Sequence, residues 1–440
     1  MKNSKTFLVT APSKDLPSAH PVLPYSKSIC NRVLVVDALA HLSDGQFDPE
    51  WRERLAGRLG VVNPLSPLIC DDTRVMLDWL CREDHSTVDV GAAGTAMRFS
   101  TALASMLDGE TVLTGSQRMK ERPIGVLVDA LRSLGAEIEY LEKEGCPPLR
   151  IKGGGMRGGT LHIAGNVSSQ YISALLMVAP MLEEGLTLSL DGEIVSRPYI
   201  NMTLRVMQDA GAQADWTNER TLRIQHTPYQ QGRLSFIEKD WSAASYWYEV
   251  LALSRHADAK VRMCGLIDSG MQGDAAVMRI FKELGVETEF RLDDLETVVL
   301  HKSDNVCCHL SWDFTATPDL AQTVVVTCCM MGVPFHFTGL QSLKIKETDR
   351  IAALQTELKK LGYDVGGNES EMWWDGVVSA PPQDLAIDTY KDHRMAMAFA
   401  PCALTLGSIR INDPMVVTKS YPTFWDDLHK AGFILTEQDA

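Results

Sequence analysis

Residues 131–140 read LRSLGAEIEY, and this pattern decides the fold because the chain uses it five times. Each occurrence is the end of an amphipathic helix, a glycine and a short alternating run, which predicts a helix, a turn and a strand. The other four are residues 207–216 MQDAGAQADW, 281–290 FKELGVETEF, 358–367 LKKLGYDVGG and 428–437 LHKAGFILTE. Their glycines are 76, 74, 77 and 70 residues apart, which indicates one repeated structural unit: Gly135, Gly211, Gly285, Gly362 and Gly432.

A second series of segments runs out of phase with the first. Each member is a polar loop followed by a helix rich in alanine and other small apolar residues, at 26–40, 91–105, 168–180, 241–254, 318–330 and 392–405. The anchors are 67, 74, 73, 77 and 74 residues apart: Ser28, Thr95, Ser169, Ser242, Asp319 and His393. The two series predict six βαβαββ repeats, three in each of two domains. Residues 136–153 and 221–237 alternate in polarity as hairpins do.

Composition excludes several classes of protein. The chain has 440 residues and a net charge of −15, which argues against a general nucleic-acid binder. No apolar run is long enough to span a bilayer, and residues 324–335 are expected to form a buried helix. The N-terminus lacks the apolar core of a signal peptide, so we expect a cytoplasmic protein. The ten cysteines show no metal-binding spacing, and we expect free thiols and no metal.

The loops before the second-series helices carry the most unusual side chains. Helix N-termini attract anions and disfavour cations, yet Lys27 and Arg32 flank the first turn at 26–40. Arg118, Lys120 and Arg122 precede another helix, and 343–350 and 391–394 are dense in charge. Each loop alone could be a solvated face or a cap. Together they favour binding of small anions beside carboxylates that can transfer protons. Gly153, Gly155 and Gly158 match a dinucleotide fingerprint, but a strand-like run follows them, so we interpret them as a hairpin loop.

These loops, in their order along the chain, resemble the EPSP synthase (3-phosphoshikimate 1-carboxyvinyltransferase) family. The resemblance runs from about Pro21 to Phe424 and rests on SKSxxNR, AGTAMR, RMxERPI, SSQ, IKETDR, DHRMAM and a late Lys-Ser-Tyr-Pro. It implies an α/β, two-domain, inside-out barrel-like enolpyruvyl transferase fold of six βαβαββ repeats. It also implies a domain of residues 21–236, a discontinuous domain of 1–20 and 237–440, and an active site in the cleft between them.

The family's reaction is also implied. Phosphoenolpyruvate and shikimate 3-phosphate give 5-enolpyruvylshikimate 3-phosphate and phosphate through a tetrahedral intermediate, in the shikimate pathway that glyphosate inhibits. The resemblance implies no cofactor, no nucleic acid or membrane partner, and a monomer. The catalytic residues would be Lys27, Asp319, Glu347 and His393. Those for shikimate 3-phosphate would be Lys27, Ser28, Arg32, Ser168, Ser169, Gln170, Ser196, Tyr199, Asp319 and Lys346. Those for phosphoenolpyruvate would be Lys27, Gly94, Arg122, Gln170, Arg350, Arg394 and Lys419.

The sequence departs from the family's usual pattern at Tyr25, Ala92 and Ser342, where glycine, asparagine and asparagine are common. Residues 41–67 form a longer stretch than the family leads us to expect. Two alternatives were weighed. The first is the sister enzyme that acts on UDP-N-acetylglucosamine, which uses a loop cysteine that residues 118–122 lack. The second is a silent homologue that only binds anions, which would have lost Lys27, Asp319, Glu347 or Arg394.

Overall fold

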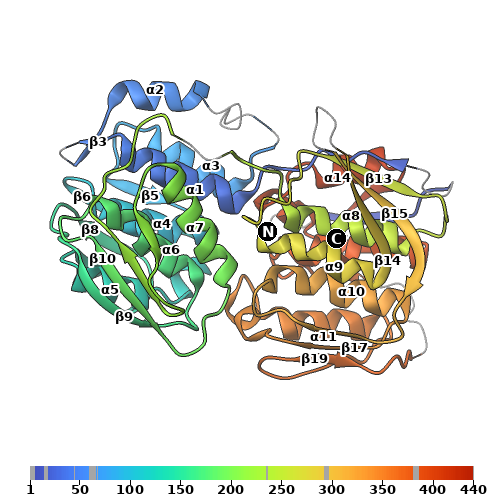
Figure 1. The fold of residues 1–440 in the computed structure, drawn as a ribbon. Helices are drawn as coiled ribbons and strands as arrows, with labels where there is room; N and C mark the ends of the chain where they lie inside the picture. The colour runs from blue at the N-terminus through green and yellow to red at the C-terminus, as the bar shows by residue number, and fades with distance from the viewer. Residues whose placement is uncertain are drawn as a thin grey trace. The chain divides into compact units, whose positions relative to one another are not determined.

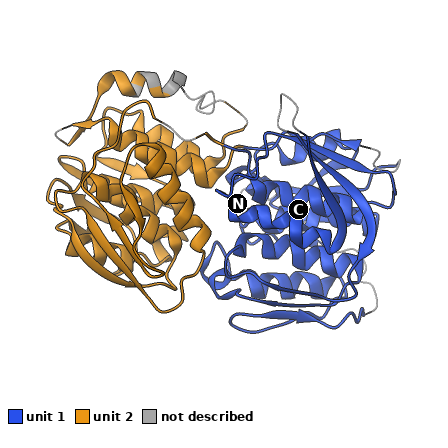
Figure 2. Cartoon of the chain, in the orientation of Figure 1, with its two compact units in different colours: residues 1–24, 238–440 blue, residues 25–237 orange. Residues whose placement is uncertain are grey.

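A computed structural model describes residues 5–13, 18–43, 45–58, 66, 68–233, 236–291, 297–379 and 386–439. The chain divides into two compact units, drawn in different colours in Figure 2. Unit 1 comprises residues 1–24 and 238–440, and unit 2 comprises residues 25–237. The sequence predicted that the chain crosses between domains near residues 20 and 237. The contacts within each unit place the divisions after Pro24 and Ile237.

Two repeats in unit 2 follow the βαβαββ order. In each, the first two strands are parallel, and the last two form a hairpin whose second strand pairs antiparallel with the second strand of the repeat. One consists of β5 Thr87–Asp89, α4 Gly94–Ala104, β6 Glu110–Thr114, α5 Gly125–Ser133, β7 Glu137–Tyr140 and β8 Leu149–Lys152. The next consists of β9 Gly159–Ala164, α6 Ser169–Val178, β10 Leu186–Asp191, α7 Arg197–Asp209, β11 Ala214–Trp216 and β12 Thr221–Ile224.

Unit 1 holds three repeats of the same order, and the N-terminal segment supplies a strand to two of them. The fourth repeat of the chain consists of β2 Ser18–Ala19, α8 Trp241–Leu253, β13 Lys260–Cys264, α9 Val277–Lys282, β14 Leu284–Arg291 and β15 Thr297–Val306. The fifth consists of β16 Leu310–Asp313, α10 Ala321–Met331, β17 Phe335–Thr338, α11 Arg350–Lys360, β18 Gly366–Gly367 and β19 Met372–Trp374. The sixth consists of β20 Ala386–Ile387, α12 His393–Phe399, β21 Ser408–Asn412, α14 Phe424–Lys430, β22 Ile434–Asp439 and β1 Lys5–Thr10.

The first repeat differs from the other five. It contains α1 Lys27–Ala40, β3 Leu42–Ser43, β4 Gln46–Phe47, α2 Pro49–Arg58 and α3 Asp71–Leu80. Among its described residues, the strands β3 and β4 pair only with each other. The fully buried Trp51 of α2 donates from its indole Nε1 to Asp37 Oδ2 of α1 over 2.9 Å and stacks on His41. The long stretch 41–67 therefore includes a helix packed on α1; its residues 44, 59–65 and 67 lie outside the described part.

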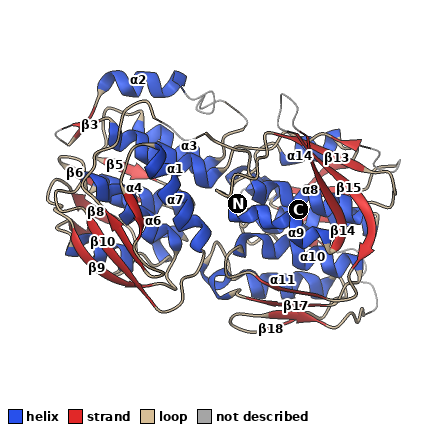
Figure 3. Ribbon diagram, in the orientation of Figure 1, coloured by secondary structure: helices blue, strands red, loops and turns tan. Residues whose placement is uncertain are grey.

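In each unit the second-series helices lie inside and the sheets lie outside (Figures 1 and 3). Every residue of α4 and of α12 is buried, and so is all of α8 except Ser242. Helices α8, α10 and α12 contact one another in unit 1, while α1, α4, α6 and α7 do so in unit 2. A helix enclosed on all sides needs small apolar residues all round, which explains the alanine-rich sequences. The inside-out α/β fold class is thus confirmed.

Local predictions were mostly right. All five repeat glycines have positive φ, between 77° and 108°, which is the left-handed conformation expected after a helix. The hairpin over 136–153 is confirmed as β7 and β8, but the other one lies earlier than predicted, at β11 and β12. Residues 153–158 connect β8 to β9 in a different sheet, so they are not a hairpin loop.

The remaining sequence predictions concern one helix and the cysteines. The buried helix expected over 324–335 ends at Met331, because Gly332 turns the chain with φ 71° before β17. No helix within the described residues is long and apolar enough to cross a membrane. All ten cysteines are free thiols.

Candidate active site

Arg350 is the centre of the charged cluster in unit 1. It is the first residue of α11, its side chain is 2% exposed, and its guanidinium contacts three carboxylates. Nε lies 2.7 Å from Asp392 Oδ2, Nη1 lies 3.1 Å from Asp319 Oδ1, and Nη2 lies 2.9 Å from Glu347 Oε2. Burial alone would lower the pKa of Arg350, but the three carboxylates together raise it above its ordinary value. Arg350 therefore stays charged and fixes the carboxylates relative to one another.

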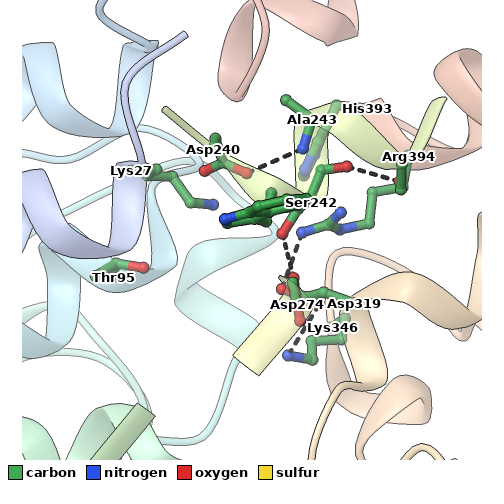
Figure 4. A network of polar contacts seen from close by, with 12 residues as sticks. Lys27, Thr95, Asp240, Ser242, Ala243, Asp274, Asp319, Lys346, His393 and Arg394 are labelled. Atoms are coloured by element: carbon green, nitrogen blue, oxygen red, sulfur yellow. Dashed lines mark hydrogen bonds and ion pairs between the residues drawn. The ribbon is translucent and has the colours of Figure 1, made fainter. Parts of the chain in front are cut away.

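Asp319 receives three cations. It lies in the short helix η4 Pro318–Leu320, immediately before α10. Besides Arg350, its carboxylate meets Arg394 Nη2 at 2.9 Å and Lys346 Nζ at 3.6 Å (Figure 4). Its side chain remains 21% exposed, so it can reach a ligand while these groups hold it. Burial lowers the pKa of Lys346, although the negative charge of Asp319 opposes that effect. The carboxylate of Asp319 can accept a proton from an incoming hydroxyl.

Glu347 lies between two cations at the edge of this cluster. Its Oε2 accepts from Arg350, and its Oε1 accepts from Lys419 Nζ at the end of η7 Pro414–Lys419. The side chains of Glu347 and Lys419 are 15% and 10% exposed. A partly exposed carboxyl group held in this way is placed to exchange a proton with a bound ligand.

The start of α12 supplies the remaining predicted residues of unit 1. Asp392 caps the helix, because its side chain accepts the Arg394 backbone N–H at 2.9 Å. Asp392 is fully buried and pairs with Arg350, so one carboxylate joins α11 to α12. His393 is 1% exposed, with Nδ1 3.7 Å from Asp392 Oδ1. Arg394 also lies near the hydroxyl of Tyr246 on α8, at 3.4 Å from Nη1.

Sequence reasoning missed Asp274, a buried carboxylate in η3 Gly273–Ala276. Ser242 Oγ at the start of α8 donates to its Oδ2 (Figure 4). Burial, and after it the charge of nearby Asp319, raises the pKa of Asp274 to about 7. Asp392 was noticed within a charged loop, but its pairing with Arg350 was not. The sequence does not indicate either pairing, because the partners of these two carboxylates lie 32 and 42 residues away.

In unit 2, polar contacts connect the starts of four helices. Gln170 Nε2 on α6 donates to Thr95 Oγ1 on α4 at 3.0 Å, and Ser168 caps α6 by accepting the Gln170 N–H. Ser169 is the first residue of α6, and Ser196 occupies the N-cap position of α7 with φ 57°, without a capping hydrogen bond from its side chain. The cation of Lys27, at the start of α1, lies 3.4 Å from Asp72 Oδ2 of α3.

Arg32 fixes this arrangement from within. Its side chain is 2% exposed and donates to Thr203 Oγ1 at 2.7 Å and Ser173 Oγ at 2.8 Å. It also donates to the carbonyls of Ser28 at 2.9 Å and Tyr199 at 3.3 Å. Burial lowers its pKa to about 10, so it remains charged at neutral pH. The resemblance implies that Arg32 binds shikimate 3-phosphate; in the structure its guanidinium also joins α1, α6 and α7.

Arg122 lies directly over Gly94 at the start of α4. A Cβ added at Gly94 would come within 2.7 Å of Arg122 Nη1, so any side chain there would displace this guanidinium. Arg98 joins the two loops by donating to the carbonyls of Gly94 and Pro123, at 3.2 Å each. No carboxylate pairs with Arg122 among the described residues, and its Nε is buried without a hydrogen-bond partner. A cation without a carboxylate partner among the described residues is suited to bind an anionic ligand.

Comparison with known proteins identifies the family. The model of the family described as EPSP synthase (3-phosphoshikimate 1-carboxyvinyltransferase) matches residues 71–428. A 3-phosphoshikimate 1-carboxyvinyltransferase of Bacteroides fragilis is 50% identical over 430 residues, covering 97% of this chain and 98% of that protein. A protein of the same name from Vibrio cholerae is 38% identical over 429 residues, covering 94% and 96%.

A solved EPSP synthase from Acinetobacter baumannii shares the fold. Its TM-score is 0.71 at 19% identity, covering 99% of this chain and all of that chain. The resemblance drawn from the loop motifs is therefore confirmed. The chain belongs to the EPSP synthase (3-phosphoshikimate 1-carboxyvinyltransferase) family.

Proposed function

We propose that this chain transfers the enolpyruvyl group of phosphoenolpyruvate to the 5-hydroxyl of shikimate 3-phosphate. The observation that carries the proposal is the pair of partly exposed carboxylates, Asp319 and Glu347, held by the one guanidinium of Arg350. The reaction needs two proton transfers, one from the attacking hydroxyl and one to C3 of phosphoenolpyruvate, and this pair supplies a fixed group for each. Family membership and the full length of the match to the Bacteroides protein support the same reaction.

In the first step, the hydroxyl oxygen bonds to C2 of phosphoenolpyruvate while its C3 methylene gains a proton. Glu347 gives that proton and Asp319 accepts the hydroxyl proton, so the charge of the pair is unchanged. In the second step, the tetrahedral intermediate loses phosphate from C2 and a proton from C3, which restores the double bond. Glu347 takes the C3 proton back, and the proton held by Asp319 passes to the leaving phosphate, so both groups return to their initial states. The cations around the pair stabilise the negative charge that develops on the leaving phosphate.

Anion binding divides among the charged groups by their surroundings. Arg122 at Gly94, together with Arg350, Arg394 and Lys419, holds phosphoenolpyruvate, and His393 supports this group from the start of α12. Ser168, Ser169, Ser196 and Gln170 bind shikimate 3-phosphate with Ser28, Tyr199 and Lys346. Arg32 belongs to the same group, and by donating to the carbonyls of Ser28 and Tyr199 it also positions these two residues for the ligand. Lys27 supports the hydroxyl and the departing phosphate.

The proposal includes residues of both units acting on the same pair of substrates, without a cofactor. It also includes a monomer and a cytoplasmic location. Both substrates carry several negative charges, while the chain as a whole is acidic. The cations of the two binding groups supply the local positive charge that attracts these substrates.

The test is phosphate release from phosphoenolpyruvate with each of three acceptors: none, shikimate 3-phosphate and UDP-N-acetylglucosamine. We expect release only with shikimate 3-phosphate. Release with the nucleotide sugar instead would assign the chain the sister activity. Release with neither acceptor would overturn the proposal, provided that the purified protein shows a cooperative thermal transition.

A further inference from the structure

Glu357 is a fully buried carboxylate to which neither the family's motifs nor the proposed mechanism gives a role. It lies on α11 seven residues after Arg350, so both side chains lie on the same face of the helix, two turns apart. Its Oε1 accepts from the hydroxyl of Tyr390 at 2.6 Å. Its Oε2 accepts from the backbone N–H of Asp388 at 3.1 Å and lies 2.7 Å from Lys360 Nζ. Glu357 therefore holds the loop that precedes α12.

That loop has an unusual backbone. Tyr390 and Lys391 have φ of 53° and 56°, so two consecutive residues with side chains adopt the left-handed conformation. L-residues rarely adopt it, and it persists only where other contacts enforce it. Lys360 adds to the contacts of Glu357 by reaching Asp388 Oδ2 at 2.9 Å. The strained pair leads directly into Asp392, His393 and Arg394.

We propose that Glu357 and Tyr390 form a clamp that positions Asp392 and Arg394 for phosphoenolpyruvate binding. Helix α11 then contacts the loop at two points: Arg350 binds Asp392, and Glu357 binds Tyr390. The contact between Glu357 and Tyr390 holds the left-handed turn in place, and this turn orients the start of α12. Glu357 and Tyr390 are positioning residues, since neither contacts the carboxylate pair. The inference rests on the proposed function only in naming the ligand.

Its kinetic test uses Glu357→Gln, Tyr390→Phe and the double variant. Tyr390→Phe removes one hydroxyl from a side chain that is 38% exposed, so the fold should survive it. We expect each single change to raise the KM for phosphoenolpyruvate about tenfold, as the loss of a charge-assisted hydrogen bond would. The dissociation constant for shikimate 3-phosphate should change less than about twofold. Tyr363→Phe, which removes the hydroxyl of a buried tyrosine outside the clamp, should leave both constants unchanged.

The double variant decides whether the two residues act as one device. If they do, its KM equals that of the worse single variant, because the second change removes a contact that is already lost. Changes that multiply would show independent effects and overturn the clamp. Equal losses in the affinity for both ligands would also overturn it, since they would indicate general damage to unit 1.

A measurement on the free protein separates this inference from the proposed function. The backbone N–H of Arg394 is bonded to Asp392 and that of Asp392 to the Thr389 carbonyl. We expect Tyr390→Phe to speed amide hydrogen exchange at residues 390–395 at least tenfold and to leave α8 unchanged. Unchanged exchange at 390–395 would overturn the clamp, whether or not the enzyme turns over. Absent turnover in the parent protein would count against the proposed function alone.

Discussion

Replacing Glu347 with glutamine should separate catalysis from binding. The change keeps the shape of the side chain and removes a group that can carry a negative charge or, once protonated, donate a proton. In the parent protein Glu347 accepts from Arg350 Nη2 at 2.9 Å and from Lys419 Nζ. Arg350 retains Asp319 and Asp392, so the rest of the cluster keeps its centre. The amide can still accept one of the two hydrogen bonds, but it cannot protonate carbon.

The expected size of the effect follows from the two roles. Loss of a positioned general acid typically costs ~10²- to 10⁴-fold in rate, or about 3 to 5 kcal/mol in the activation free energy. Stability should fall less, by about 2 kcal/mol in the free energy of unfolding, because one charge-assisted contact is lost from a partly exposed site. The dissociation constant for shikimate 3-phosphate should stay within about twofold of its parent value, since Glu347 is assigned no part in binding that ligand.

The assay is steady-state phosphate release at saturating concentrations of both substrates, with calorimetric titration of shikimate 3-phosphate. Glu369→Gln is the matched control: it breaks a Glu–Lys pair of 2.5 Å with Lys344, but its side chain is 85% exposed. That control should retain full turnover. A Glu347→Gln variant with turnover within about threefold of the parent would refute the assignment of Glu347 as proton donor.

Three further changes test the cluster. Arg350→Met leaves buried Asp392 without its cation, so it should cost about 3 to 5 kcal/mol in the free energy of unfolding. A loss below about 1 kcal/mol in urea titrations would contradict the role of Arg350 as the centre of the cluster. Asp274→Asn removes a carboxyl whose pKa of about 7 lies above its ordinary 3.8, so the parent loses stability relative to the variant as pH rises from about 4 through 7. The difference in Tm should therefore grow between pH 5 and pH 8, up to an equivalent of about 4 kcal/mol, and a constant difference would argue against burial of that charge. Lys391→Asn should raise Tm without changing the KM for phosphoenolpyruvate, because asparagine tolerates φ 56° better than lysine by about 1 kcal/mol. The control is Lys359→Asn inside α11, which should lower Tm slightly because asparagine is a poorer helix former.

Short-range signals in the sequence predicted the repeat and the helix starts. Thr95, Ser169, Ser242 and His393 all lie in the first two positions of a helix, because capping chemistry and the polar-to-apolar change mark such starts locally. The repeat glycines were found for the same reason, since a left-handed turn after a helix needs a residue without Cβ. From Thr95 onward the helix starts and the glycines alternate 31 to 43 residues apart, about half a repeat, and so indicate the order of its elements.

Long-range pairings could not be predicted in this way. Arg350 meets Asp392 across 42 residues, and Glu357 meets Tyr390 across 33, yet nothing in either segment encodes the distance to the other. Arg32 shows the same limit, because nothing near it in the sequence indicates Ser173 and Thr203, to which its guanidinium donates. The first repeat also escaped prediction, because α2 takes up a stretch where the other repeats have no counterpart, and Trp51 gave no sign of its partner Asp37.

The most direct test of the central claim is the deuterium content of the product formed in D₂O. If C3 of phosphoenolpyruvate is protonated and then deprotonated, the product should have the mass of 5-enolpyruvylshikimate 3-phosphate with deuterium in its methylene group. Mass spectrometry and proton NMR of the purified product measure both. A product without deuterium would contradict addition followed by elimination at this carboxylate pair, and the absence of that product would contradict the function itself.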